Sequence, residues 1–124
     1  MVLVLGIFFR CTHLDHKVYW RDEAFTSLRV SGFTVADVRH QLFDGHEIGK
    51  ADLQIYQQLS AAKSWRDTVQ SLVVEDSQHP PLYYLLARGW MQYFGSSVAA
   101  IRSLSALLGV LVLPSLYWLC LELF

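Results

Sequence analysis

Apolar residues gather at the two ends of this chain and leave a polar stretch between them. Residues 1–9 read MVLVLGIFF and are followed by Arg10, and the stretch Leu104–Leu121 carries no charge. A helix needs about 20 predominantly apolar residues to cross the hydrocarbon core of a bilayer. The pattern predicts one transmembrane helix over residues 98–124. It also predicts that residues 1–10 end a first transmembrane helix whose beginning is missing, and that the chain is cut at both ends.

A third apolar segment, residues 80–95, reads PPLYYLLARGWMQYFG. The Pro-Pro pair suits the start of a helix, and Arg88 and Gln92 interrupt the apolar body. The segment is short for a span, so we expect it to be tilted, interfacial at one end or shielded by neighbouring helices. Gly95-Ser96-Ser97 predicts a tight turn before the last helix. These segments together predict an all-α, multi-pass membrane protein in which residues 80–95 form the second transmembrane helix.

The polar region, residues 11–79, predicts short amphipathic helices rather than strands. Gly32 is expected to stop the first helix, and Thr34 with Asp37 has the pattern of an N-cap followed by an acidic residue at N3. Helices this short bury little area, so we expect them to rest on the membrane spans or the bilayer interface. If the first span runs outward, this region is an extracytoplasmic loop of juxtamembrane helices. The four predicted helices cover residues 22–31, 34–43, 51–60 and 64–76.

Composition strengthens the membrane interpretation. Hydrophobic residues make up 53% of the chain and charged residues 17%, whereas soluble domains carry about 25% charged residues. The net charge of −1 and the scattered arginines give no basic stripe, which argues against a nucleic-acid partner. Cys11 and Cys120 are far apart and match no metal-binding spacing, so we expect two free, buried thiols.

Two adjacent carboxylates, Asp22 and Glu23, follow the first apolar segment and open a predicted helix. A structural role is simple: Asp22 caps the helix and Glu23 favours its first turn, where free backbone N–H groups and the helix dipole attract negative charge. A functional role is also open. A carboxylate at the membrane surface can deprotonate an acceptor hydroxyl, or help to bind a divalent cation that bridges phosphate oxygens.

A second polar cluster, Glu75-Asp76-Ser77-Gln78-His79, stands immediately before Pro80-Pro81, where the chain re-enters the membrane. The two prolines fix the backbone and would hold Gln78 and His79 at a set depth. An imidazole can ligate a metal ion or donate to a phosphate oxygen. The alternative is a polar interfacial cap followed by aromatic residues.

Two arginines lie within or beside apolar helices. An arginine there is costly unless its side chain reaches the interface or meets an anion. Arg102 is close to a membrane boundary, so we expect its side chain to extend to the interface. Arg88 is deeper in its segment, and a buried carboxylate or a phosphate is a candidate partner.

The motifs YWRDEAFTSLR and QHPPLYYLLARGWMQYFGSSVAAIRSLSALLGVLVLPSLYWLCLELF resemble the GT-C superfamily of integral-membrane glycosyltransferases. The resemblance covers essentially the whole chain. It is strongest to the glycosyltransferase family 39 type, which includes the protein O-mannosyltransferases and the lipid A aminoarabinose transferase. It implies many transmembrane helices in a bacterial inner or plasma membrane and a helical first extracytoplasmic loop. It also implies transfer of a sugar from a polyprenyl-phosphate-linked donor to a lipid or protein acceptor on the outer face.

The resemblance also implies roles for individual residues. Asp22 takes the position of the catalytic carboxylate, with Glu23 beside it. The aminoarabinose transferases have a phosphate-contacting lysine before Pro-Pro, where this chain has His79, so the phosphate role of that position stays open. The predicted phosphate-binding residues are His79, Gln78 and Arg88, the predicted metal ligands for a divalent ion are Asp22 and His79, and Arg102 is structural.

On this interpretation the chain is the N-terminal fragment of an inverting transferase and is inactive alone. The alternative is a non-enzymatic multi-pass membrane protein. It would be a transporter or flippase subunit, or an anchor whose polar loop binds another protein.

Overall fold

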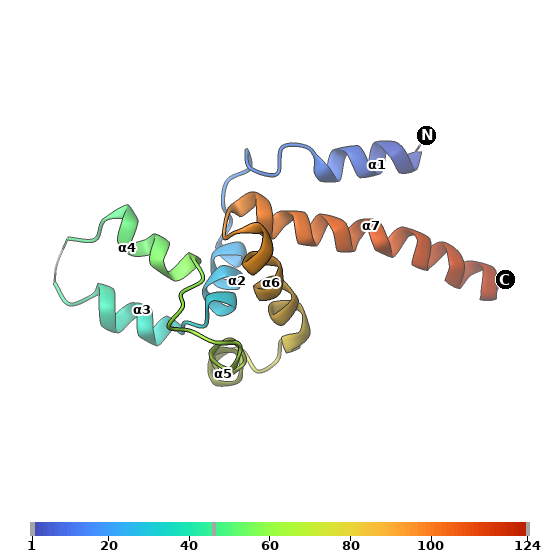
Figure 1. Cartoon of the computed structure of the whole chain (residues 1–124). Coiled ribbons are helices and arrows are strands. Elements are labelled where there is room, and N and C mark those ends of the chain that lie inside the picture. The colour runs from blue at the N-terminus through green and yellow to red at the C-terminus, as the bar shows by residue number, and fades with distance from the viewer. Residues whose placement is uncertain (1, 46, 124) are drawn as a thin grey trace. The chain divides into compact units, whose positions relative to one another are not determined.

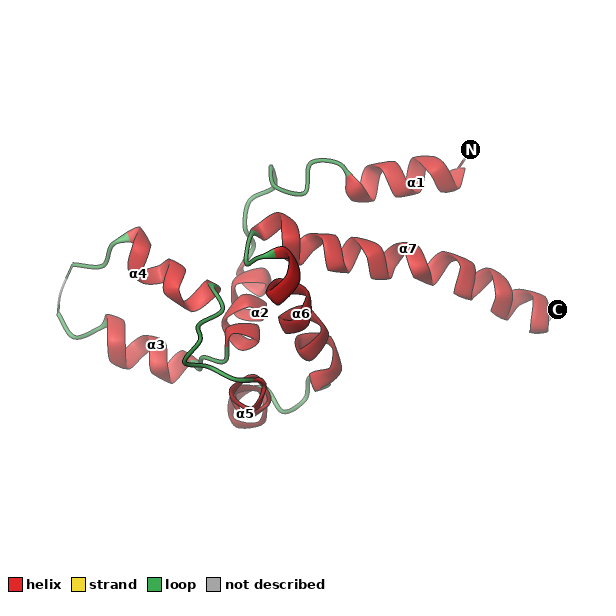
Figure 2. Cartoon of the chain, viewed as in Figure 1, coloured by secondary structure: helices red, strands yellow, loops and turns green. Residues whose placement is uncertain are grey.

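The computed structural model describes residues 2–45 and 47–123; Met1, His46 and Phe124, including the outermost residues of two predicted spans, lie outside the described residues. The described residues form seven α-helices and one 3₁₀ turn, η1, with no β-strand among them (Figures 1 and 2). The all-α prediction is therefore confirmed. The elements are α1 (Val2–Cys11), α2 (Arg21–Ser31), α3 (Val35–Leu42), α4 (Lys50–Gln54), η1 (Ile55–Gln57), α5 (Trp65–Glu75), α6 (Pro81–Phe94) and α7 (Val98–Leu123).

The chain divides into two compact units. The terminal unit comprises α1, α7 and the segment up to Val18, and the middle unit comprises Tyr19–Ser96. The predicted helix 80–95 becomes α6, which packs against α2 and α5 of the middle unit. With 14 residues, α6 is shorter than the ~20 that cross a bilayer. Its role as a second span stays a prediction.

The terminal unit contains the one described helix that is long and apolar enough to cross a membrane, α7, which has 26 residues and includes an 18-residue stretch with a mean hydropathy of 2.1. Within this unit α1 packs against α7, and Arg10 Nη1 donates a hydrogen bond to the Gly109 carbonyl oxygen over 2.8 Å. Arg102 donates to three backbone carbonyl oxygens in the segment after α1, those of Leu14, Lys17 and Val18. Arg102 thus ties α7 to that segment, which fits the structural role expected for it.

The cysteines differ in one respect from expectation. Cys11 and Cys120 are free, but both side chains are exposed rather than buried. They lie at the last residue of α1 and near the last turn of α7, where most of the neighbouring apolar side chains are also exposed within this chain. The apolar sequence context led us to expect buried thiols, and that expectation was wrong. Both thiols are exposed because α1 and α7 cover only part of one another's surface.

Local signals account for most helix boundaries in the middle unit. Gly32 ends α2 with a φ of 84°, the left-handed conformation that glycine adopts without strain. Thr34 Oγ1 accepts a hydrogen bond from the Asp37 N–H over 3.0 Å, and the Asp37 carboxylate accepts one from the Thr34 N–H over 2.8 Å. This is the reciprocal capping pattern expected at the start of α3. The predicted helix 51–60 is instead split into α4 and η1.

The middle unit has its own hydrophobic core. Leu28, Phe33, Leu42 and Tyr56 are buried against one another, with two valines of α3 packed beside them. The tighter turn of η1 accompanies the burial of Tyr56, whose ring meets Phe33 edge-to-face at 5.1 Å. The short helices therefore bury a core among themselves, whereas we expected them to need the membrane spans for this.

Arg88 joins three elements of the middle unit. It is 2% exposed, and its guanidinium donates to the Val30 carbonyl oxygen over 2.7 Å and to Thr68 Oγ1 over 3.0 Å. A further hydrogen bond goes to the Lys63 carbonyl oxygen. Because a buried cation is costly without acceptors, these contacts fix α6 against α2 and α5.

We expect Gly32→Ala to destabilise the middle unit by roughly 2–4 kcal/mol, because alanine is strained at this φ and its Cβ would lie 2.9 Å from Asp67 Cβ. Native-state hydrogen exchange of the α2 amides measures the loss. The control is Gly32→Asn, because asparagine tolerates the left-handed conformation better than alanine but places a Cβ at the same point beside Asp67. Full recovery of stability in Gly32→Asn would contradict the close contact with α5.

Candidate functional site

Asp22 and His79 line the same pocket of the middle unit, although they are far apart in the sequence. The pocket has a volume of about 230 Å³ and is bounded by α2, by the segment after α5 and by α6. It is the described pocket whose lining is richest in charged side chains. Its lining residues are Asp22, Phe25, Thr26, Arg29, Asp76, His79 and Tyr84.

α2 supplies four of the seven lining residues. Asp22, Thr26 and Arg29 recur at i, i+4 and i+7, which places them in one row on a helix. Asp22 lies in the first turn of α2 and is exposed. Within the described residues, no hydrogen bond or ion pair engages its carboxylate. The carboxylate is therefore open to a ligand in the pocket.

Glu23 has a different position from its neighbour. Its Oε2 accepts a hydrogen bond from the Trp20 N–H over 2.9 Å, which satisfies a free backbone donor at the start of α2. The capping role that the sequence left open for the pair therefore belongs to Glu23, and Asp22 is not the N-cap. Glu23 is not among the residues lining the pocket.

The turn after α5 holds His79 in place. The Asp76 N–H donates to the Leu72 carbonyl oxygen at the end of α5, and the His79 N–H donates to the Asp76 carbonyl oxygen over 3.0 Å. The side chains of the same two residues also meet, with His79 Nδ1 2.6 Å from Asp76 Oδ1. An ionised carboxylate only accepts hydrogen bonds, so Nδ1 carries the proton in this pair and Nε2 is left for a ligand.

Arg29 brings a positive charge to the pocket and is only 5% exposed. Its Nη1 lies 2.5 Å from Glu75 Oε2, and the Glu75 carboxylate also accepts hydrogen bonds from the N–H groups of Val35 and Ala36 at 2.8 and 3.2 Å. Partial burial alone would raise the pKa of Glu75. The hydrogen bonds from Val35, Arg29 and Ala36 outweigh burial and hold that pKa below its ordinary value of 4.5.

Two other predicted site residues lie elsewhere. Gln78 is exposed and does not line the pocket. Arg88 is buried among backbone carbonyl oxygens and Thr68, and it also lies outside the pocket lining. Their phosphate-binding roles stay predictions, and the structure gives Arg88 protein acceptors in place of the anion that its depth suggested.

Arg29, Asp76 and Tyr84 are pocket residues that sequence reasoning missed. The spacing could have indicated Asp76, because the side chain of an Asp three residues before a His can contact the imidazole across a turn. The signal for Arg29 was its place one turn beyond Thr26 on the face of Asp22. The ring of Tyr84 stands edge-on to His79 with centroids 6.4 Å apart.

In the described part of the chain, no three His, Cys, Asp or Glu side chains come together in the way that metal ligands do. The divalent ion predicted at Asp22 and His79 therefore stays a prediction. Comparison of the chain with protein families, with curated proteins and with solved structures finds no match.

We expect Glu75→Gln to destabilise the middle unit by roughly 2 kcal/mol at neutral pH, because the buried Arg29 guanidinium would lose its carboxylate counter-ion. A carboxyl whose pKa is lowered by folding stabilises above its unfolded value and loses that contribution as pH falls through the folded value. The difference in thermal midpoint between wild type and variant should therefore shrink on acidification from about pH 7 to about pH 3. A difference that stays constant over this range would contradict the ion pair.

Proposed function

We propose that this chain is part of a multi-pass membrane glycosyltransferase that moves a sugar from a polyprenyl-phosphate-linked donor to an acceptor hydroxyl on the extracytoplasmic side. The observation that carries the proposal is the shared pocket of Asp22 and His79. The sequence motifs that contain these residues are those that resemble the GT-C superfamily. α7 supplies a helix able to anchor such an enzyme in a membrane.

The pocket contains the groups that an inverting displacement needs. Asp22 is exposed and takes the proton of the acceptor hydroxyl as that oxygen bonds to the anomeric carbon. The bond between the anomeric carbon and the phosphate oxygen breaks, and polyprenyl phosphate leaves with the electron pair. Arg29, two turns along α2 from Asp22, offers N–H donors to the phosphate and stabilises its developing charge. His79, from the turn after α5, does the same in its imidazolium form, in which both ring nitrogens carry a proton.

In this proposal Arg29 binds the phosphate, which is the role that the sequence suggested for Arg88. A guanidinium that already has a carboxylate partner adds less net charge to the pocket, so the Arg29–Glu75 pair orients donors rather than supplying a full positive charge. The Asp76–His79 contact similarly fixes the imidazole ring. Precise placement of these groups lowers the activation barrier of sugar transfer, because the groups need little reorganisation to reach the transition state.

The test is Asp22→Asn in the intact protein in its membrane, supplied with a panel of polyprenyl-phosphate sugars. Release of polyprenyl phosphate should fall by roughly 10²–10⁴-fold, the usual contribution of a general base. The control is Glu47→Gln, an exposed carboxylate outside the pocket lining, which should leave the rate unchanged. A folded, membrane-inserted Asp22→Asn protein that releases polyprenyl phosphate at the wild-type rate would rule out this role.

A further inference from the structure

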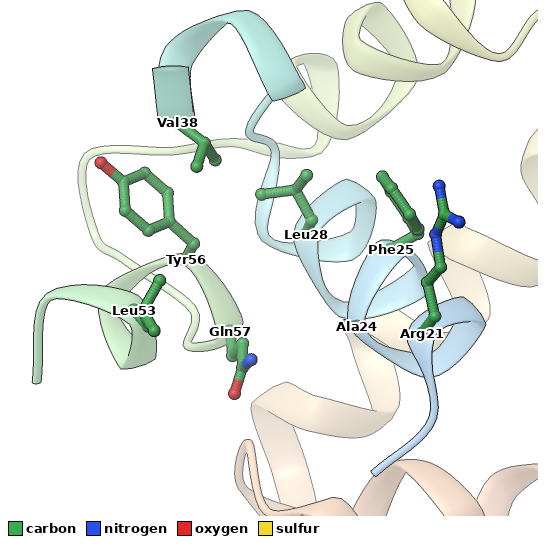
Figure 3. A pocket seen from close by; sticks show the side chains of 8 residues that line it. All are labelled: Arg21, Ala24, Phe25, Leu28, Val38, Leu53, Tyr56 and Gln57. Carbon is green, nitrogen blue, oxygen red and sulfur yellow. The ribbon is translucent and has the colours of Figure 1, made fainter. Parts of the chain in front are cut away.

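The groove lined by α2, α3, α4 and η1 offers a ligand little surface. Figure 3 shows Leu28 pointing toward Tyr56 and Val38, and the residues Leu28 and Tyr56 are only 8% and 6% exposed. Both already belong to the hydrophobic core of the middle unit. Exposed side chains that can bind a ligand occur instead in the segment that follows α1, where His13 and His16 lie three residues apart.

His13 and His16 stand at the two ends of a turn in the terminal unit. The His16 N–H donates to the His13 carbonyl oxygen over 3.4 Å and closes the turn. His13 has a φ of 56°, in the left-handed region that few residues other than glycine adopt. Within this turn the two imidazole rings lie together, with centroids 5.3 Å apart and planes at 69°.

Arg102 fixes the backbone of this turn to α7. Its guanidinium donates to the Leu14 carbonyl oxygen inside the turn, and to the carbonyl oxygens of Lys17 and Val18 directly after it. The backbone that carries the two imidazoles is therefore held before any ligand binds. Such preorganisation lowers the cost of ordering a binding site.

The ring nitrogens of the two histidines are open to a ligand. Within the described residues, no hydrogen bond or ion pair engages the His13 imidazole. His16 Nε2 lies 3.8 Å from Asp15 Oδ1, which is beyond hydrogen-bonding distance. Both histidines are exposed, so dissolved ions reach them. The Asp15 carboxylate adds a negative charge that favours a cation over an anion.

The separation of the two rings suits a single metal ion. Zn–N bonds are about 2.0–2.1 Å long, so two imidazoles at the tetrahedral angle on one zinc ion have ring centroids about 5 Å apart. The observed 5.3 Å is close to this value. Imidazole is a good ligand for zinc and copper, whereas magnesium and calcium prefer oxygen ligands. The chemistry of the pair therefore favours zinc over magnesium.

We propose that His13 and His16 bind one zinc ion through their imidazoles, with water in the remaining coordination positions. A site with two protein ligands agrees with the finding that no three ligand side chains come together among the described residues. The proposal goes beyond sugar transfer, because neither histidine lines the Asp22–His79 pocket. A bound ion joins the two ends of the turn and tightens the segment that Arg102 holds.

The first test is calorimetric titration of the intact protein in nanodiscs with zinc chloride. His13→Asn removes one ligand and keeps a residue that tolerates the left-handed conformation. His16→Gln removes the other ligand at an exposed position. Each variant should weaken zinc binding by roughly tenfold or more, because the ion then has one imidazole in place of two. Magnesium chloride in large excess should not displace the zinc.

The second test counts the imidazoles directly by pulsed EPR of Cu²⁺ added in place of zinc. The wild-type protein should show two imidazoles on one Cu²⁺ ion, and His13→Asn should show one at most. The matched control for both tests is His40→Ala, which removes an exposed histidine of α3 and should change neither the zinc affinity nor the EPR signal.

Several results would overturn the proposal. One is unchanged zinc affinity in both His13→Asn and His16→Gln, and another is a single imidazole on Cu²⁺ in the wild type, as expected if the two rings merely pack edge to face. Loss of zinc binding in His79→Ala alone would assign the ion to the other pocket. Displacement of zinc by magnesium would also reject the site. Neither test measures sugar transfer, so these failures would leave the transferase proposal standing.

Discussion

Two buried arginines hold the middle unit together, and the candidate site depends on them. Arg88 reaches from α6 to the Val30 carbonyl oxygen on α2 and to Thr68 on α5. Arg29 reaches from α2 to Glu75 at the end of α5. Burying two cations is costly unless acceptors surround them, so the hydrogen bonds of their Nη atoms favour the observed packing of α2, α5 and α6, whereas Nε of each arginine has no partner among the described residues. That arrangement brings the turn after α5 next to the first turns of α2.

The chemistry of the pocket follows from this packing. α5 ends at Glu75, and the next four residues form the turn that carries Asp76 and His79. Since Glu75 is fixed to α2 by Arg29, the turn meets the row of Asp22 and Thr26 on that helix. The carboxylate of Asp22 and the guanidinium of Arg29 on α2 thus line one pocket with the oriented imidazole of His79, which is remote from them in the sequence.

The features that the sequence predicted correctly are those set by interactions between residues close together in the chain. The helices α2, α3, α5, α6 and α7 lie close to their predicted positions because glycine, capping pairs and apolar periodicity act within a few residues. The sequence did not predict the end of α4, the burial of Arg29 or the partners of Arg88, for which it suggested an anion. The acceptors that the two guanidinium groups reach are brought together from other segments by tertiary packing. Asp22 and His79 were identified through motifs, and their shared pocket could not be derived from spacing alone.

The central claim is that Asp22 and His79 line a single pocket. The most direct measurement places cysteines at these two positions, with Cys11 and Cys120 changed to serine, and treats the intact protein with a short bifunctional thiol reagent. We predict that the peptides containing positions 22 and 79 become linked, and that a control pair at positions 22 and 47 does not. Equal linkage of the two pairs, or none at 22 and 79 in a folded protein, would contradict the claim.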